Sequence, residues 1–259
     1  MEELTSRNNP AVKAAAALKE LKERKKTGLF LLEGARLCKD GALNGVEIKQ
    51  FFVTEKAREK YAAEYEILAE KSEKSFLIPE SVAEKLSDTK NSQGFFAVCR
   101  QPELSRETDP DGMYVFTDNV QNPDNMGAIV RTAEAMGADG IIVNSGCDIY
   151  SSKALRASMG ALLRFPVIRT DSAQEILSVC KRNGMKIFAS VVDPSAEDVT
   201  KASKDGGCVL IIGNEGNGIS DETLELSTHR ITIPMKGKAE SLNASAAATV
   251  LIWEFMKDR

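Results

Sequence analysis

The sequence is poor in the residues on which several common enzyme classes depend. It contains one histidine, His229, so a Ser-His-Asp hydrolase would rest entirely on that residue, and a structural role is the better interpretation. The five cysteines include no CxxC pair, which argues against a zinc site and against a disulfide framework. We therefore expect reduced, mostly buried thiols and no metal.

The common nucleotide fingerprints are absent as well. The chain has neither a GxGxxG motif nor a GxxxxGK[ST] phosphate loop, so nicotinamide-dependent enzymes and nucleoside triphosphatases lose support. No apolar run approaches the roughly 18 residues of a membrane span, and the charged opening MEELTSRNNP lacks the pattern of a signal peptide. We expect a cytoplasmic protein with no membrane partner.

The composition is that of a chain that folds. Hydrophobic residues make up 42% and charged residues 28% of 259 residues, which is enough for two compact units. The formal net charge is −4. Because affinity for RNA comes chiefly from lysine and arginine against phosphate, any RNA site on this chain must be local.

The N-terminal half begins with a predicted helix over residues 11–26, AVKAAAALKELKERKK. Alanine and long straight side chains favour helix, and Asn8, Asn9 and Pro10 supply start signals. The end of this helix is basic, and its charges fit phosphate contacts and a solvated helix face equally well. The residues concerned are Lys22, Arg24, Lys25 and Lys26.

Strand-like and helix-like segments alternate through the rest of this half. LFLLE, IKQFFV and GFFAVCR have the apolar character of strands, and polar helical segments lie between them. The stretch QPELSRETDPDG collects prolines, charges and a glycine without apolar periodicity. We place the first domain at 1–105, a linker at 106–112 and the second domain at 113–259.

The second half predicts a mainly parallel sheet covered by helices. MYVFTD, GIIVN, MKIFASVV, CVLIIG and RITIP alternate with helical stretches. Ligands bind beyond the carboxyl ends of the strands in such folds, so the informative loops are those after MYVFTD, CVLIIG and RITIP. The fold class is therefore α/β, with a smaller α/β domain in front.

Each of the three loops also has an ordinary structural interpretation. Arg131 would decorate a solvent-facing helix surface, and Glu215 would accept hydrogen bonds from a helix N-terminus or a neighbouring loop. Ser241 or Asn243 would cap the final helix. That helix has little polar surface, which favours burial in a subunit interface.

Taken together, the three loops point to one family. NPDNMGAIVRTAEAMGA, IIGNEGNGIS and IPMKGKAESLNASAAA, in this order, resemble the signature motifs of the SpoU (TrmH-like) branch of the SPOUT methyltransferases across residues 113–257. The resemblance implies an α/β fold with a trefoil knot, a homodimer, and S-adenosylmethionine as cofactor without metal. It also implies methylation of a ribose 2′-hydroxyl of RNA.

The same resemblance assigns roles to individual positions. Arg131 is the candidate for activating the ribose hydroxyl. The other positions that match polar residues of the family are Asn125, Glu215, Ser241 and Asn243. The positions expected to bind the cofactor, largely through main-chain groups, are Leu210, Gly213, Asn214, Gly216, Ile233, Met235 and Leu242.

The N-terminal half resembles the substrate-binding domain that precedes this module in many ribosomal RNA ribose methyltransferases. The resemblance turns the basic cluster into an expected RNA contact, with Arg7 and Lys13 as helpers, and favours ribosomal RNA over tRNA. Three alternatives remain open: a tRNA ribose methyltransferase, a catalytically silent RNA-binding relative, and an α/β enzyme with another cofactor.

Overall fold

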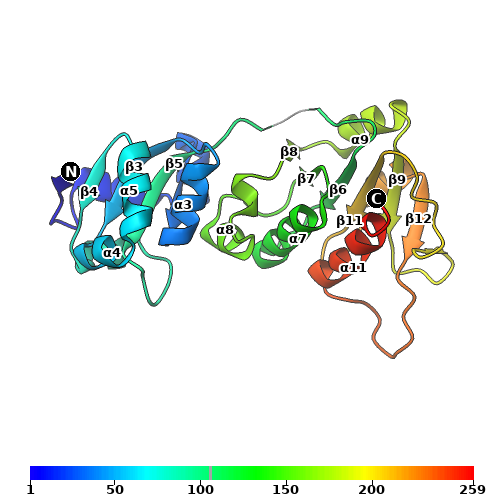
Figure 1. Ribbon diagram of the computed structural model, residues 1–259. Coiled ribbons are helices and arrows are strands. Elements are labelled where there is room, and N and C mark those ends of the chain that lie inside the picture. Colours follow the sequence, from blue (N-terminus) through cyan, green and yellow to red (C-terminus); the bar gives the residue numbers. More distant parts are fainter. Residues whose placement is uncertain (105–106) are drawn as a thin grey trace. The chain divides into compact units, whose positions relative to one another are not determined.

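The structure is a computed structural model that describes residues 1–104 and 107–259. It divides into two compact units (Figure 1). The first contains Met1–Glu103 and Asp148–Arg164, and the second contains Leu104–Cys147 and Phe165–Arg259. The segment 148–164 therefore groups with the first unit, although it follows the predicted boundary in sequence. Residues 105 and 106, where that boundary and the linker meet, lie outside the described residues.

A five-stranded mixed sheet forms the centre of the first unit. The two strand pairs at one side are parallel and the two at the other side are antiparallel. The strands, in spatial order, are β1 (Glu2–Glu3), β4 (Ser75–Leu77), β3 (Ile48–Val53), β5 (Phe95–Arg100) and β2 (Leu29–Glu33). The helical segments are α1 (Pro10–Ala17), α2 (Leu21–Thr27), α3 (Ala35–Leu43), α4 (Glu55–Lys60), α5 (Ala62–Lys71), α6 (Glu80–Leu86), α8 (Ser152–Ala157) and η1 (Ala161–Leu163).

The predicted single helix over residues 11–26 is in fact two helices, α1 and α2, with a break after Ala17. Asn9 caps α1 as its sequence position predicts, accepting a hydrogen bond from the Ala11 amide at 2.8 Å. At the break, Nη1 of Arg24 donates to the carbonyls of Leu18 and Lys19 at 2.6 and 2.7 Å. A side chain therefore satisfies carbonyls that a continuous helix would have used, and helix propensity alone could not reveal this.

Arg24 is buried, unlike the other basic residues of its cluster. Its side chain is 6% exposed, and its Nε donates to the Asp148 carboxylate at 2.6 Å. Lys22, Lys25 and Lys26 are exposed. The expectation that Arg24 contacts RNA is therefore corrected, because its guanidinium is already engaged inside the first unit.

A seven-stranded, wholly parallel sheet forms the centre of the second unit. In spatial order its strands are β10 (Glu197–Asp198), β12 (His229–Thr232), β9 (Lys186–Ser190), β11 (Cys208–Ile212), β6 (Met113–Asp118), β7 (Gly140–Asn144) and β8 (Val167–Thr170). The predicted α/β class, with a parallel sheet in the second half and a smaller α/β unit before it, is confirmed.

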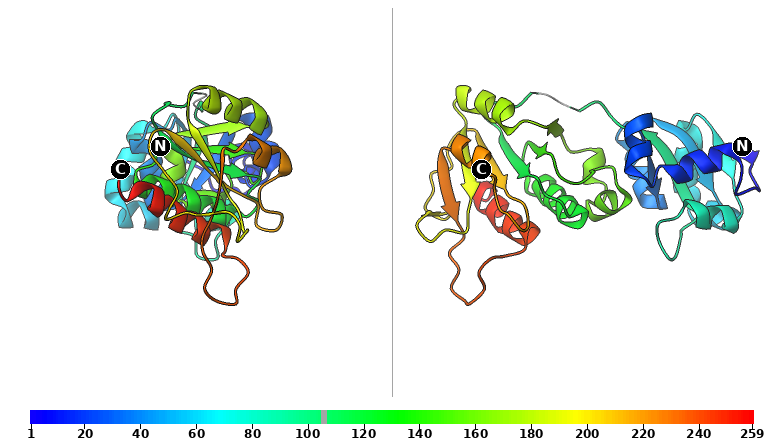
Figure 2. Two further views of the ribbon diagram at one scale, coloured as in Figure 1. Left: turned by 90° about the vertical axis from the view of Figure 1, so that its right-hand side faces the viewer. Right: turned by 180° about the vertical axis from the view of Figure 1, so that it is seen from behind.

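Helices cover both faces of the parallel sheet (Figure 2). α7 (Pro123–Met136) and α11 (Ala244–Met256) pack together, as do α9 (Ala173–Arg182) and α10 (Asp221–Leu226). Because both faces are covered, every residue of β11 (CVLII) is apolar and buried, and the strand shows no alternation of apolar and polar side chains. Phe188 packs edge-on against Phe255 of α11 at 4.9 Å, whereas Ile187 belongs to the core on the α9 side.

The single histidine and most cysteines have the structural roles predicted for them. His229 stacks on Phe188 at 4.8 Å and shares a hydrogen bond with Thr228. Four of the five cysteines are buried, and burial raises the pKa of the Cys208 thiol to about 11. Within the described part of the chain, no helix is both long and apolar enough to cross a membrane.

The Arg24→Met variant should lose about 3 kcal/mol of unfolding free energy, because it leaves the Asp148 charge, the buried Leu18 carbonyl and the partly buried Lys19 carbonyl without their partner. Urea denaturation followed by circular dichroism measures the loss. Lys25→Met, on the exposed side of the same helix, should change stability by less than about 0.5 kcal/mol. Equal effects of the two variants would contradict the buried role of Arg24.

Candidate active site

Three loops of the second unit meet at one edge of its parallel sheet. β6 leads into α7 and β12 into α11 (Figure 1), and β11 leads into α10. β6 and β11 are direct neighbours, and β12 follows on the other side of β9. Because the carboxyl ends of parallel strands share an edge, segments about a hundred residues apart in the chain come together there.

Glu215 joins the second of these loops to the first. One carboxylate oxygen accepts a hydrogen bond from the Gln121 amide at 3.1 Å. The other accepts from the Asn122 amide at 3.0 Å and from Nδ2 of Asn125 at 2.9 Å. Asn122 caps α7, so the carboxylate lies at a helix N-terminus, where negative charge is favourable. This is the structural role that the sequence predicts for Glu215.

Asn125 and Asn243 extend the connection to the third loop. Asn125 is 7% exposed, and its Oδ1 accepts a hydrogen bond from Nδ2 of Asn243 at 3.1 Å. The Oδ1 of Asn243 caps α11 by accepting from the amides of Ser245 and Ala246. A continuous chain of hydrogen bonds therefore runs from Glu215 through Asn125 to Asn243 and fixes three loops at once.

The contacts of Glu215 keep its side chain ionised. Partial burial raises the pKa of the carboxyl, but hydrogen bonds from Asn125 and from the amides of Gln121 and Asn122 outweigh it. The net result is a pKa below the ordinary value of 4.5. The carboxylate is thus charged at neutral pH and acts as an acceptor for the other loops.

The GNEGNGIS loop closes on itself where β11 ends. The main chains of Asn214 and Gly218 exchange two hydrogen bonds, at 2.8 and 3.0 Å. A Cβ atom on Gly213 would lie 2.4 Å from the main chain of Gly218, so only glycine fits there. Nδ2 of Asn214 donates to the Asn119 carbonyl at 2.8 Å. This turn thus holds the second loop against the first.

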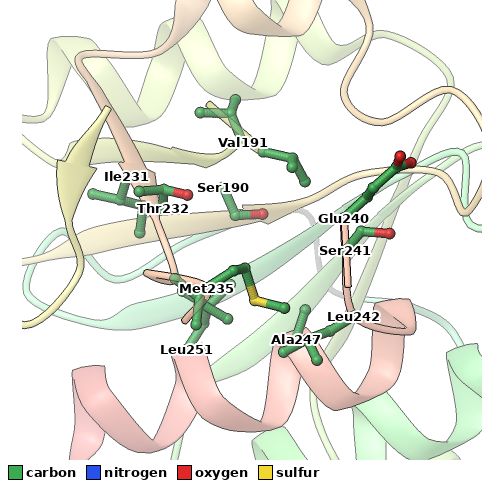
Figure 3. Close-up of a pocket in the computed structure, with 12 residues that line it drawn as sticks. Ser190, Val191, Ile231, Thr232, Met235, Glu240, Ser241, Leu242, Ala247 and Leu251 are labelled. Carbon is green, nitrogen blue, oxygen red and sulfur yellow. The ribbon is translucent and has the colours of Figure 1, made fainter. Parts of the chain in front are cut away.

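A cavity of about 470 Å³, counting its open mouth, lies between the end of β12 and the start of α11 (Figure 3). Its walls come from the end of β9 with the residues after it, from β12 with the residues after it, and from α11 with the segment leading into it. The lining residues are Ser190, Val191, Val192, Ile231, Thr232, Ile233, Met235, Glu240, Ser241, Leu242, Ala247 and Leu251.

The cavity combines apolar side chains with unused main-chain groups. Across the described residues, Ile233, Met235 and Leu242 take part in no main-chain hydrogen bond. Such a pocket suits a ligand that is largely apolar and carries a few polar atoms. Glu240 adds one carboxylate to the lining, which suits a ligand that also carries positive charge.

The residues predicted to bind a cofactor divide into two groups. Ile233, Met235 and Leu242 line the cavity, and so does Ser241. The other four predicted cofactor residues do not line the cavity. Leu210 is fully buried in β11, where its main chain pairs with β6 on one side and with β9 on the other. The others are Gly213, Asn214 and Gly216, which belong to the GNEGNGIS turn.

Arg131 lies on α7, about two turns beyond its first residue, Pro123. Its side chain is exposed, and none of the described residues forms a hydrogen bond or ion pair with it. The guanidinium is therefore available to a bound molecule. Across the described chain, no group of three or more His, Cys, Asp or Glu side chains could hold a metal ion.

Asp118 is a site residue that the sequence-based search missed. It ends β6, is 3% exposed, and its Oδ2 accepts from both the amide and the hydroxyl of Ser220 at 2.8 Å. Its Oδ1 accepts from Nδ2 of Asn144 at 3.0 Å. Asp118 thus fixes the end of the GNEGNGIS loop. An acid closing a buried strand run, MYVFTD, was the available signal.

Known proteins match both units. Residues 112–253 match the SpoU rRNA Methylase family. The chain belongs to that family. Residues 9–97 match the MRM3-like substrate binding domain. The family resemblance inferred from the three motifs is thereby confirmed, and the N-terminal match agrees with the looser resemblance of the first half.

Methyltransferases from other organisms resemble this chain over nearly its full length. Uncharacterized tRNA/rRNA methyltransferase slr1673 of Synechocystis is 31% identical over 97% of this chain and 92% of its own. The 23S rRNA (guanosine(2553)-2′-O)-methyltransferase RlmP of Bacillus subtilis is 29% identical over 98% of both chains. An AdoMet-bound rRNA methyltransferase from Sinorhizobium meliloti has a TM-score of 0.87 and 29% identity, covering 99% of this chain and 98% of its own.

Glu215→Gln should lower the thermal midpoint of unfolding by a few degrees at pH 7, because the amide offers one acceptor oxygen to the three groups that donate to the carboxylate. The decrease should be no larger, because water can accept some of the hydrogen bonds that the glutamine cannot. The folded pKa of Glu215 is lowered, so its contribution is fully present above 4.5 and is lost as the pH falls through the folded pKa. The difference between the two proteins should therefore shrink below pH 4.5. A constant difference from pH 7 to acid would contradict this assignment.

Proposed function

We propose that this protein transfers a methyl group from S-adenosylmethionine to a ribose 2′-hydroxyl of ribosomal RNA. The observation that carries the proposal is the hydrogen-bond chain from Glu215 through Asn125 to Asn243, which ties three loops together, the third of which lines a cavity. Similarity to RlmP and to an AdoMet-bound rRNA methyltransferase supports it. A ribosomal RNA substrate also agrees with the cytoplasmic location expected from the sequence.

The cavity at the end of β12 is the proposed cofactor site. S-adenosylmethionine, when bound, supplies a methyl group on a cationic sulfur that an oxygen nucleophile can displace. The free main-chain groups of Ile233, Met235 and Leu242 fit the polar edge of its adenine, and the apolar walls fit the ring. Gly213 and Asn214 would act indirectly, by holding the loop beside the cavity.

Arg131 is the proposed catalytic residue. A 2′-hydroxyl is a poor nucleophile, so the site must orient it and stabilise the negative charge that develops on the oxygen as the O–CH₃ bond forms, the S–CH₃ bond breaks and the hydroxyl proton passes to water. The guanidinium group offers five N–H donors and no acceptor, which suits donation of hydrogen bonds to the reacting oxygen rather than proton removal. We place Ser241 at the cavity wall as a second polar contact, while Asn125, Glu215 and Asn243 hold the loops in position.

The first unit is the proposed RNA-binding domain. On its surface, Lys22, Lys25 and Lys26 follow one another on α2 and are exposed. Arg7 and Lys13 are exposed as well. These five side chains are free to meet phosphates, whereas Arg24 is not. Local basic surface of this kind lets an acidic chain bind RNA.

The protein is proposed to act as a homodimer. α11 buries Leu251, Ile252 and Phe255 but leaves an apolar face uncovered, where Val250 is 43% and Trp253 is 55% exposed. Positions 246, 249, 250 and 253 share this face by their helical spacing, and the small side chains among them allow close approach. A second copy of the same helix is the occupant favoured by the family.

Arg131→Ala should bind S-adenosylmethionine as the unaltered protein does, yet lose methyl transfer by about a hundredfold or more, because only the reacting oxygen loses its partner. The assay uses methyl-labelled S-adenosylmethionine with unmodified ribosomal RNA and tRNA, followed by digestion to nucleosides. Arg182→Ala, an exposed arginine of α9, is the matched control and should retain full activity.

The position of the label tests the proposed reaction itself. Label on the ribose of ribosomal RNA supports the proposed reaction. Label on the ribose of tRNA instead would show that tRNA is the substrate. Label on a base would overturn the ribose assignment. Near-normal turnover by Arg131→Ala would refute the catalytic role proposed for this arginine.

Trp253→Asp should convert the dimer to a monomer, because a charge in an apolar interface is costly to bury. Light scattering during size-exclusion chromatography should give twice the 28.2 kDa chain mass for the unaltered protein and the single mass for the variant. Val179→Asp, at a 37% exposed position on α9, should remain dimeric. A monomeric unaltered protein would refute the homodimer.

A further inference from the structure

The first unit carries a polar groove that plays no part in the cofactor site described above. One wall is α4 with the tyrosine that follows it, and the other is the segment before β5. The groove encloses about 1000 Å³, including its open side. The side chains that matter here are Lys56, Lys60, Tyr61, Asn91, Ser92 and Gln93.

The two walls are fixed to each other at the base of the groove. The Thr54 amide donates to the Gly94 carbonyl at 2.9 Å, and the Thr54 hydroxyl caps α4 by accepting from the Ala57 amide. Gly94 has φ +67°, and a Cβ there would lie 2.4 Å from Oγ1 of Thr54. The Gly94 amide in turn donates to Oγ of Ser92 at 3.0 Å. The groove is therefore formed before any ligand arrives.

The groove offers more hydrogen-bond donors than acceptors. Lys56 and Lys60 form no ion pair among the described residues, although Arg58 between them pairs with Glu55. Oε1 of Gln93 accepts from the Ala35 amide at 3.0 Å, which leaves the Gln93 NH₂ group for a ligand. Glu80 is the one acid in the lining. A ligand that is rich in acceptors, with negative charge, fits this arrangement.

Tyr61 adds an aromatic surface to the charged wall. Its half-buried ring meets Phe95 edge-on at 6.2 Å, which holds it in place. The Lys60 ammonium lies 5.2 Å from the centroid of the same ring. Lys56 lies one helical turn before Lys60, on the same face of α4. Aromatic rings next to lysines are the combination that binds unpaired nucleotides, by stacking on bases and contacting phosphates.

We propose that this groove binds an unpaired stretch of the RNA substrate, with Lys56 and Lys60 at its phosphates, Tyr61 against a base and Asn91 to Gln93 at base edges. The proposal rests on the proposed function for the identity of the RNA. The ring of Tyr61 beside the two lysines favours RNA over an acidic protein segment, because a base can stack on the ring while the adjoining phosphates meet the lysines.

The test compares two double variants of the full chain. Lys56→Ala with Lys60→Ala removes the groove lysines, and Lys71→Ala with Lys74→Ala removes two exposed lysines elsewhere in the same unit. The probe is unmodified 23S ribosomal RNA transcribed in vitro, measured by filter binding over a series of salt concentrations. The groove variant should bind about tenfold more weakly with a salt slope smaller by about 1 to 2, because two phosphate contacts are lost. The control should stay within about twofold.

A second measurement locates the RNA directly. Ultraviolet cross-linking of the complex, followed by mass spectrometry of the peptides, should place RNA on Tyr61 or on the segment 91–93. Cofactor binding by the groove variant, measured by calorimetry, should be unchanged. An affinity loss equal to that of the control, or no cross-link in the groove, would overturn the proposal.

Failure of the groove and failure of the proposed reaction give different results. Weaker RNA binding by the groove variant, together with no methyl transfer by the unaltered protein, would support the RNA-binding groove and refute the proposed reaction. Normal methyl transfer by the groove variant, with an unchanged KM for RNA, would support the proposed reaction and refute the RNA-binding groove.

Discussion

The Glu215 carboxylate holds the candidate active site together. It accepts hydrogen bonds from the N-terminal end of α7 and, through Asn125, connects to the residue that caps α11. The parallel sheet brings the three loops to one edge, but loops at a common edge are still free to move apart. A charged acceptor with three donors from a neighbouring loop removes that freedom. At the other end of the GNEGNGIS loop, Asp118 restrains the main chain by accepting hydrogen bonds from the amide and the hydroxyl of Ser220.

Much of the fold could be predicted because the strands and the helix starts carry local signals. CVLII, MYVFT and GIIVN are apolar at nearly every position, since helices cover both sheet faces, and Asn9 and Asn243 are caps that any helix start would favour. The break after Ala17 could not be predicted, because it depends on Arg24 and on a partner, Asp148, that is far away in sequence.

The candidate site was predictable as a set of loops, but not as a set of contacts. Periodicity located the strand ends, and the family motifs supplied Arg131 and the cavity residues Ile233, Met235 and Leu242. The same motifs also supplied Leu210, whose main chain is used inside the sheet. Asp118 escaped notice because a single acid at the end of a strand has no spacing pattern. The trefoil knot that the resemblance implies stays a prediction, since chain threading has no signature in periodicity.

The distribution of charge in the first unit bears on the RNA binding that we propose for it. A chain with a net charge of −4 gains little from non-specific attraction to RNA, so the RNA binding that we propose would come from a few unpaired lysines on particular surfaces. In the first unit several basic groups are already neutralised by acids, as Arg24 is by Asp148 and Lys49 by Glu47 and Glu73. The groups left without a partner then decide where RNA can bind. In the proposed RNA complex, the placement of these few contacts rather than the total charge decides which surface meets the RNA.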